Sequence, residues 1–128
     1  MIKMWAIIKF ENKNLEILKQ DLKKKLTDEV VFYNPKLLIE KFRFNKLERK
    51  EFNLLGDYVF CYNKNFKEES TVRSLKFSKG LKHFLNGFVV SQKEIVNFIS
   101  RCKDAENKDG YLSQDFFELE KNLNYKFS

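Results

Sequence analysis

Two short segments carry apolar side chains at nearly every position, and this feature constrains the fold more than any other. They are residues 2–10, with the sequence IKMWAIIKF, and residues 54–62, with the sequence LLGDYVFCY. Successive side chains of a β-strand point to opposite faces of a sheet, so both segments present apolar groups on both faces. Such strands belong inside a sheet that is covered, at least partly, on both sides.

Three further segments have the periodicity or the boundary signals of helices. Residues 14–26 place four leucines at steps of three and four, which gives one apolar stripe and a lysine-rich outer face. Residues 68–79 form a shorter amphipathic pattern. Residues 92–103 follow a capping box in which Ser91 precedes Glu94 by three positions. We therefore predict two helices within the sheet-forming region and a third after it.

The remaining strands are predicted from shorter patterns. Residues 29–33 form a short apolar run, and residues 81–90 are expected to form a strand with a turn near Asn86–Gly87. Residues 36–53 alternate loosely, with a hairpin expected at residues 42–46. The resulting order is β-α-β-β-α-β-α. Strands that do not alternate strictly with helices favour an α+β fold, here a four-stranded, mostly antiparallel sheet flanked by helices. The ferredoxin-like or RNA-recognition-motif-like split βαβ sandwich fits this order best.

The domain organisation is predicted from the length and from a change in polarity. With 128 residues, the chain has room for one domain and a tail. We expect a domain over residues 1–103 and a linker or tail over residues 104–128. The tail has apolar side chains at helical spacing, and these are Leu112, Phe116, Leu119 and Leu123. Such a helix could mask a binding face, or it could begin a second domain.

Composition narrows the class of partner. The net charge is +7, from 25 basic and 18 acidic residues, which favours an acidic partner such as nucleic acid. Lysines far outnumber arginines, so we expect contact with phosphates rather than readout of bases, although a solvated lysine-rich surface would have the same composition. Two cysteines, Cys61 and Cys102, and a single histidine, His83, give no disulfide framework, metal site or cofactor site. Without an apolar run of about 18 residues or a cleavable leader, we expect a cytoplasmic protein that does not cross a membrane.

Aromatic side chains are more numerous than this small sheet can bury. Tyr58, Phe60 and Tyr62 fall on one face of their strand, and Trp5 lies in the other doubly apolar strand. Two helices cover one face of a four-stranded sheet, and a third helix covers only part of the other. We therefore predict an exposed aromatic patch that binds a partner through Tyr58 or Phe60, the alternative being that all these rings are core.

Several segments, taken in order, give the chain a family resemblance. Residues 4–8 (MWAII) look like the first strand of the N-terminal domain of NusG-type transcription elongation factors, the group that includes RfaH. Residues 32–36 (FYNPK) are similar to that family's strand ending in proline, and residues 80–85 (GLKHFL) to a later strand. Residues 54–60 (LLGDYVF) resemble its signature Leu-Phe-Pro-Gly-Tyr-Val/Leu-Phe, with departures at its second, third and fourth positions. The resemblance covers roughly residues 4–100, and the family's C-terminal barrel, the KOW domain, is expected to be absent or truncated.

The resemblance implies a monomeric binding factor and not an enzyme. In the family, this domain sits on the clamp helices of the largest subunit of RNA polymerase, reaches the second-largest subunit, and suppresses pausing, as in antitermination. The positions carried over to the clamp-helix contact are Tyr58, Phe60, Leu55 and Lys9. Those carried over to the opposite jaw of the polymerase are Thr71, Val72 and Arg73. Those expected near upstream or non-template DNA are Lys19, Lys23, Ser78 and Lys79.

Two other functions remain open at this stage. A module that binds single-stranded RNA would also display aromatic rings on a sheet. However, Asp57 is acidic where RNA would approach, and the residue directly before Gly56 is not basic. An enzyme would need a nucleophile with its base, a phosphate-binding loop or a carboxylate pair, and the sequence contains no such set. We expect His83 to be an ordinary strand residue and Cys61 a small buried apolar side chain.

Overall fold

The computed structural model describes residues 4–11 and 13–116, which fold into two compact units. The first, here the sheet unit, contains Met1–Asn34 and Asp57–Phe98, and the second, the hairpin unit, contains Pro35–Gly56 and Ile99–Ser128. The chain thus leaves the first unit, builds a hairpin and returns. The predicted domain boundary after residue 103 falls inside a helix, α3 (Gln92–Ala105).

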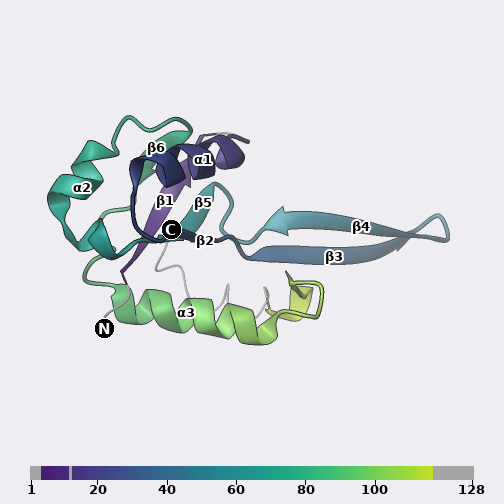
Figure 1. Ribbon diagram of the computed structural model, residues 1–128. Helices are drawn as coiled ribbons and strands as arrows, with labels where there is room; N and C mark the ends of the chain where they lie inside the picture. The colour runs from purple at the N-terminus through teal and green to yellow at the C-terminus, as the bar shows by residue number, and fades with distance from the viewer. Residues whose placement is uncertain (1–3, 12, 117–128) are drawn as a thin grey trace. The chain divides into compact units, whose positions relative to one another are not determined.

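The sheet unit is built on four antiparallel strands in the order β2-β5-β1-β6 (Figure 1). These are β1 (Trp5–Phe10), β2 (Val31–Tyr33), β5 (Tyr58–Tyr62) and β6 (Leu81–Phe84). The helix α1 (Leu15–Lys25) connects β1 to β2 with β5 between them. The short helices η1 (Lys64–Lys67) and α2 (Glu69–Ser74) connect β5 to β6 with β1 between them. Two interlocked split βαβ units result, and the predicted α+β fold is confirmed.

The register of β1 against β5 explains why both strands are apolar at nearly every position. Ala6 lies opposite Cys61 and Ile8 opposite Val59, and these four side chains are fully buried on the face that α1 covers. Leu18 and Leu22 of α1 are also fully buried, as the leucine stripe predicts. The other face contains the pairs Trp5–Tyr62, Ile7–Phe60 and Lys9–Tyr58.

The first half of α3 covers one end of this second face. The ring of Phe98 lies 6.0 Å from that of Phe60, and Ile95 is fully buried. The Gln92 side chain accepts a hydrogen bond from the Trp5 backbone N–H at 2.8 Å and donates one to the Trp5 carbonyl oxygen at 2.6 Å. The predicted capping-box segment therefore anchors α3 to the first strand at the Trp5 end of the face.

A glycine fixes how closely β6 approaches α1. Gly80 has a φ of +80°, and a Cβ placed there would lie 2.8 Å from the Asn14 backbone oxygen and 3.2 Å from Leu18 Cβ. Both the left-handed backbone and the lack of space require glycine at this position. The chain can therefore turn into β6 directly against the start of α1.

The hairpin unit is dominated by two eight-residue strands, β3 (Lys36–Arg43) and β4 (Lys46–Asn53) (Figure 1). Their connection is Phe44–Asn45, with φ values of 52° and 61°, which is the left-handed pair of a type I′ turn. The hairpin predicted at residues 42–46 is therefore confirmed. A two-residue strand, β7 (Tyr111–Leu112), pairs in parallel with Lys36 and Leu37 at the base of β3.

Several predicted elements are shorter than expected, and glycines explain most of the differences. The segment 54–62 becomes a strand only at Tyr58, after a turn at Gly56 with a φ of +64°. The strand predicted over residues 81–90 ends at Phe84, and the turn predicted near Asn86–Gly87 is present, with Gly87 at a φ of +84°. The helix predicted over residues 68–79 is instead η1 followed by the six-residue α2.

The predicted tail helix is wrong at its first position. Leu112 lies in β7, after a left-handed Gly110 with a φ of +86°, and its side chain is buried. Pairing with β3 satisfies the backbone groups of this segment, which the helical spacing alone did not predict. Leu119 and Leu123 lie outside the described residues.

Candidate functional site

Three side chains meet at the end of the sheet face that the first half of α3 leaves uncovered. Two of them, Lys9 and Tyr58, were predicted for the clamp-helix contact, and the third is His83. Lys9 is the register partner of both Tyr58 on β5 and His83 on β6, so all three side chains leave the same face. The Lys9 ammonium lies 5.6 Å from the centre of the Tyr58 ring, and the Tyr58 and His83 rings meet edge to face at 6.5 Å. We call these residues the Lys9–Tyr58–His83 cluster.

This cluster is more exposed than Trp5, Ile7 and Phe60 on the same sheet face, while Tyr62 on that face is also partly exposed. His83 is exposed, and Lys9 and Tyr58 are partly exposed. The predictions that Phe60 and Trp5 could lie at the surface are wrong, because they are 0% and 5% exposed. Phe60 stacks on Tyr33 at 6.4 Å and packs against Phe98, so its ring belongs to the core. This burial also removes the central ring that an RNA-recognition module would need on this face.

Two of the residues predicted for the opposite jaw lie near the same cluster. Val72 and Arg73 of α2 line a shallow hollow at the β6 edge, and His83 lines it as well. The Arg73 guanidinium forms an ion pair with Glu69 at 3.0 Å, one helical turn earlier. Thr71 faces a different hollow, with Lys25 and Leu26 at the end of α1, so the three predicted neighbours line two separate hollows.

The residues expected near DNA form a less uniform group. Ser78 is 5% exposed and its hydroxyl accepts a hydrogen bond from the Lys25 ammonium at 3.2 Å, so its side chain is not open to solvent as a DNA contact would require. The Lys19 ammonium lies 3.5 Å from Glu16 and 5.9 Å from the Phe32 ring. Lys23 and Lys79 are exposed.

An acidic side chain lies among these cations and reduces their net charge. The backbone N–H of Lys79 donates to Asp21 at 2.8 Å, and the Lys25 ammonium lies 3.0 Å from the same carboxylate. These two contacts lower the pKa of Asp21, because both favour its ionised form. Asp21 therefore stays charged near neutral pH and offsets one lysine.

Leu55, the last residue predicted for the clamp contact, is half-buried and belongs to the hairpin unit.

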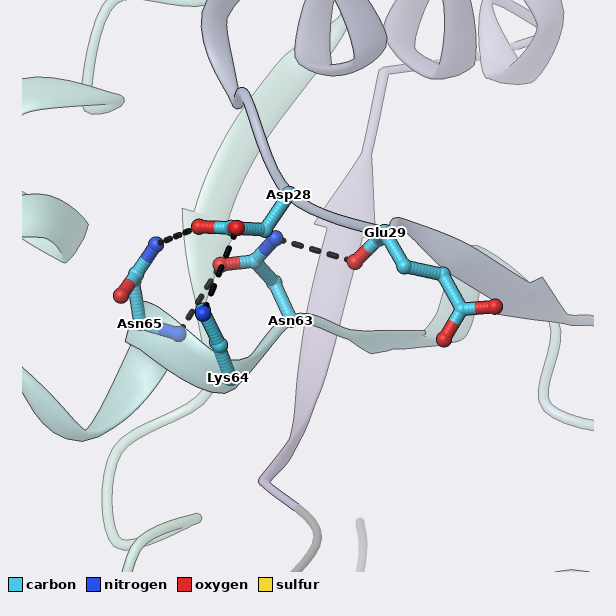
Figure 2. Close-up of polar contacts among 5 residues, drawn as sticks. All are labelled: Asp28, Glu29, Asn63, Lys64 and Asn65. Carbon is cyan, nitrogen blue, oxygen red and sulfur yellow. Dashed lines mark hydrogen bonds and ion pairs between the residues drawn. The ribbon is translucent and has the colours of Figure 1, made fainter.

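Sequence reasoning missed a polar cluster where β5 ends (Figure 2). Asn63 is fully buried. Its side chain donates to the Glu29 carbonyl oxygen at 3.1 Å and accepts from the Asn65 backbone N–H at 2.9 Å. Asp28 accepts from the Asn65 side chain at 2.8 Å and lies 3.4 Å from the Lys64 ammonium. These contacts fix η1 to the loop before β2, so we assign the cluster a structural role. Asn63 and Asn65, which follow an apolar strand closely, were the feature of the sequence that could have indicated this cluster.

Cys61 is buried as expected, and burial raises the pKa of its thiol, which makes it a poor nucleophile. In residues 4–11 and 13–116, no group of three or more His, Cys, Asp and Glu side chains is arranged to hold a metal ion. Over the same residues, no helix combines the length and apolar character needed to span a bilayer.

Comparison with known proteins does not assign a family. No family model matches the chain, and no curated protein matches its sequence. The resemblance described above therefore remains an interpretation of the sequence.

Proposed function

We propose that the chain is a NusG-type transcription elongation factor that binds the clamp helices of RNA polymerase through the Lys9–Tyr58–His83 cluster. The observation that supports this most strongly is the contrast along one sheet face. Trp5, Ile7 and Phe60 are buried beside the first half of α3, and Tyr62 at that end is partly exposed, whereas at the other end all three side chains, Lys9, Tyr58 and His83, are partly or fully exposed. Tyr58 is also the tyrosine of the segment that resembles the family signature.

The cluster has the chemistry of a protein-docking surface. A tyrosine offers a large apolar ring with a polar end, and tyrosine is enriched among the residues that dominate binding energy. The Lys9 ammonium over its ring and the adjacent His83 add polar contacts around this anchor. An α-helix of the polymerase clamp would cover the ring and leave both flanking groups at the rim.

The second contact of the proposed factor involves α2. Val72 and Arg73 line the hollow that His83 shares, so a partner seated on the cluster has a continuous path to them. We assign them to the opposite jaw of the polymerase. Lys23 and Lys79 are the candidates for contact with the phosphates of upstream or non-template DNA, a contact that is independent of sequence. By holding the clamp closed, such a factor suppresses pausing.

The test is the affinity of the protein for RNA polymerase purified from the cells that make it. We expect Tyr58→Ala to weaken binding roughly 30-fold, the loss typical of a central aromatic anchor. The matched control is Tyr62→Ala, which removes the same side-chain type from the same strand and face, at the end beside Trp5. We expect this control to retain polymerase binding within about threefold.

Two further measurements keep the test independent of folding. Circular dichroism must show that both tyrosine variants are folded. The exposed His83→Ala removes a neighbour of Tyr58 without opening the core, and we expect a smaller loss of affinity. Equal affinity of the wild type, Tyr58→Ala and His83→Ala would exclude this surface as the docking site.

A further inference from the structure

The β3–β4 hairpin displays three large apolar side chains to solvent at its turn (Figure 1). Phe42, Phe44 and Leu47 are 80%, 90% and 45% exposed. Phe42 and Leu47 are register partners and leave one face of the hairpin, and Phe44 lies in the turn two positions further on. Two positions of a strand span about 7 Å, so the three side chains lie within one shallow layer. We call residues 42–47 the hairpin tip.

The charges of the hairpin are arranged differently in the tip and behind it. In the tip, Arg43 lies opposite Lys46, both side chains are exposed, and residues 42–47 contain no acidic residue. Immediately behind the tip, each cation lies opposite a carboxylate, in the pairs Lys41–Glu48 and Glu40–Arg49. The second of these pairs forms an ion pair at 3.0 Å. The tip therefore holds two cations together, and an anionic partner complements it.

Stability alone does not explain this composition. Like charges directly opposite each other destabilise a strand pair, and Arg43 and Lys46 form such a pair. Phe44 has a φ of 52°, a conformation that is costly for a bulky residue and favours asparagine or glycine. The strand β7 pairs with β3 only as far as Leu37, about 17 Å before Phe42 at the rise of a strand, so it does not cover the rings. The tip is therefore suited to binding a partner.

A membrane interface provides both environments that the tip requires. Lipid phosphates lie just above the boundary of the acyl chains, and segments that lie in this interface bury their apolar groups about 5–10 Å deep. The layer that contains Phe42, Phe44 and Leu47 fits this depth. Arginine and lysine have long apolar stems, so Arg43 and Lys46 can reach back to the phosphates while the rings enter the boundary.

The charges behind the tip favour a membrane over nucleic acid. A nucleic acid strand that follows the hairpin needs cations along the ribbon, because its phosphates recur along its length. Residues 36–41 and 48–53 contain four cations and three carboxylates, so most of their positive charge is compensated. A membrane contacts only the projecting end of the hairpin and does not need cations behind it.

We propose that the hairpin tip inserts into the interface of a membrane that contains anionic phospholipid. Phe42, Phe44 and Leu47 enter the boundary of the acyl chains, and Arg43 and Lys46 contact lipid phosphates. An insertion of this size is reversible and does not cross the bilayer. The inference goes beyond the proposed function and concerns the hairpin unit alone. Its test uses vesicles and no polymerase, so either proposal can fail without the other.

The test is co-sedimentation of the full chain with vesicles of phosphatidylcholine that contain about 30% phosphatidylglycerol, beside vesicles of phosphatidylcholine alone. We expect the wild type to bind the anionic vesicles roughly tenfold more tightly, because each cation near the surface adds attraction. Phe44→Asn should weaken this binding roughly tenfold through loss of the inserted ring, although asparagine suits the turn better. Phe42→Ala lies outside the turn and should give a similar loss without changing the turn.

Matched controls separate the tip from the rest of the surface. Phe77→Ala removes a ring that is 89% exposed, with the Lys76 ammonium 5.8 Å from its centre, and we expect less than about a twofold change. Arg43→Gln should weaken binding to anionic vesicles roughly fivefold. Lys50→Gln is its control, because Lys50 lies opposite Ile39, about 13 Å behind Arg43 and on the same face. The potential of the lipid surface falls off within a Debye length of about 8–10 Å, so we expect less than about a twofold change.

Several outcomes would overturn the proposal. It fails if the wild type does not bind the anionic vesicles, or if it binds the neutral vesicles equally well. It also fails if Phe44→Asn and Phe42→Ala bind as the wild type does, or if Phe77→Ala loses as much affinity as they do. Binding of an oligonucleotide through Phe44, without binding of vesicles, would show that nucleic acid is the partner instead. The circular dichroism spectra of the variants should match that of the wild type.

Discussion

The β1–β5 pair and the β3–β4 pair are both antiparallel, yet their side chains have opposite environments. On β1 and β5, the side chains between Trp5 and Ile8 and between Val59 and Cys61 are buried on both faces of the sheet. On β4, every residue is exposed, although all eight of its positions pair with β3. Backbone pairing is thus common to both regions, and the difference lies in whether helices cover the faces. Rings on the first pair stabilise the fold, and rings on the second are available to a partner.

The largest expected effect of a mutation is loss of a ring from the covered pair. Phe60→Ala removes a fully buried side chain that packs on Tyr33 and Phe98, and we expect it to lower the free energy of unfolding by about 3–5 kcal/mol. Phe42→Ala, at an exposed position, should change it by less than about 0.5 kcal/mol. Urea denaturation of both variants measures the two values. Similar losses would show that the two strand pairs do not differ as described.

A smaller loss of stability is expected at Gly80, which precedes β6 and lies against the start of α1. Gly80→Ala places a Cβ against the backbone of Asn14 and Leu18 in a left-handed conformation, and we expect a loss of about 2–4 kcal/mol. Gly56→Ala is the matched control, because Gly56 also has a positive φ but has open space around its Cβ position. It should cost only about 1 kcal/mol. If thermal or chemical denaturation gave equal losses, close packing at Gly80 would not be the cause.

The smallest effect is a gain in stability at the hairpin turn. Phe44→Asn replaces a bulky side chain at a φ of 52° with a residue that tolerates this conformation, and we expect the hairpin to gain about 0.5–1 kcal/mol. Phe44→Val should lose a similar amount, because a β-branched residue is poorly suited to positive φ. Hydrogen exchange of the amides in β3 and β4 reports this local change. A loss of protection in Phe44→Asn would argue that the ring stabilises the turn.

The sequence predicts the sheet unit better than it predicts the site. Strands with apolar side chains on both faces must lie inside a sheet that is covered on both sides. β1 and β5 are covered on both faces over most of their length. The leucine stripe of α1 and the hairpin turn were likewise predictable from spacing and from local turn chemistry. The expected exposure of Phe60 was wrong because periodicity assigns a residue to a face but does not show where along that face a helix lies.

The role of His83 and the pairing of β7 depended on tertiary structure. His83 lies in strand β6, as expected, and its contact with Tyr58 follows from the placement of β6 beside β1, which local sequence does not encode. Leu112 fits a helical stripe by spacing, but a parallel pairing with β3 holds it in a strand. The contact of His83 and the pairing of Leu112 both involve partners distant in sequence, and at Leu112 such a partner outweighs local preference.

The most direct test of the proposed docking surface is site-specific photo-crosslinking in a complex with RNA polymerase. A photoreactive phenylalanine analogue would replace Tyr58 in one variant and the exposed Phe77 in a control, and each crosslinked polymerase subunit would be identified by mass spectrometry. We expect position 58 to crosslink to the clamp helices of the largest subunit and position 77 not to do so. No crosslink from position 58 in a complex that forms with normal affinity, or equal crosslinking from both positions, would contradict the account.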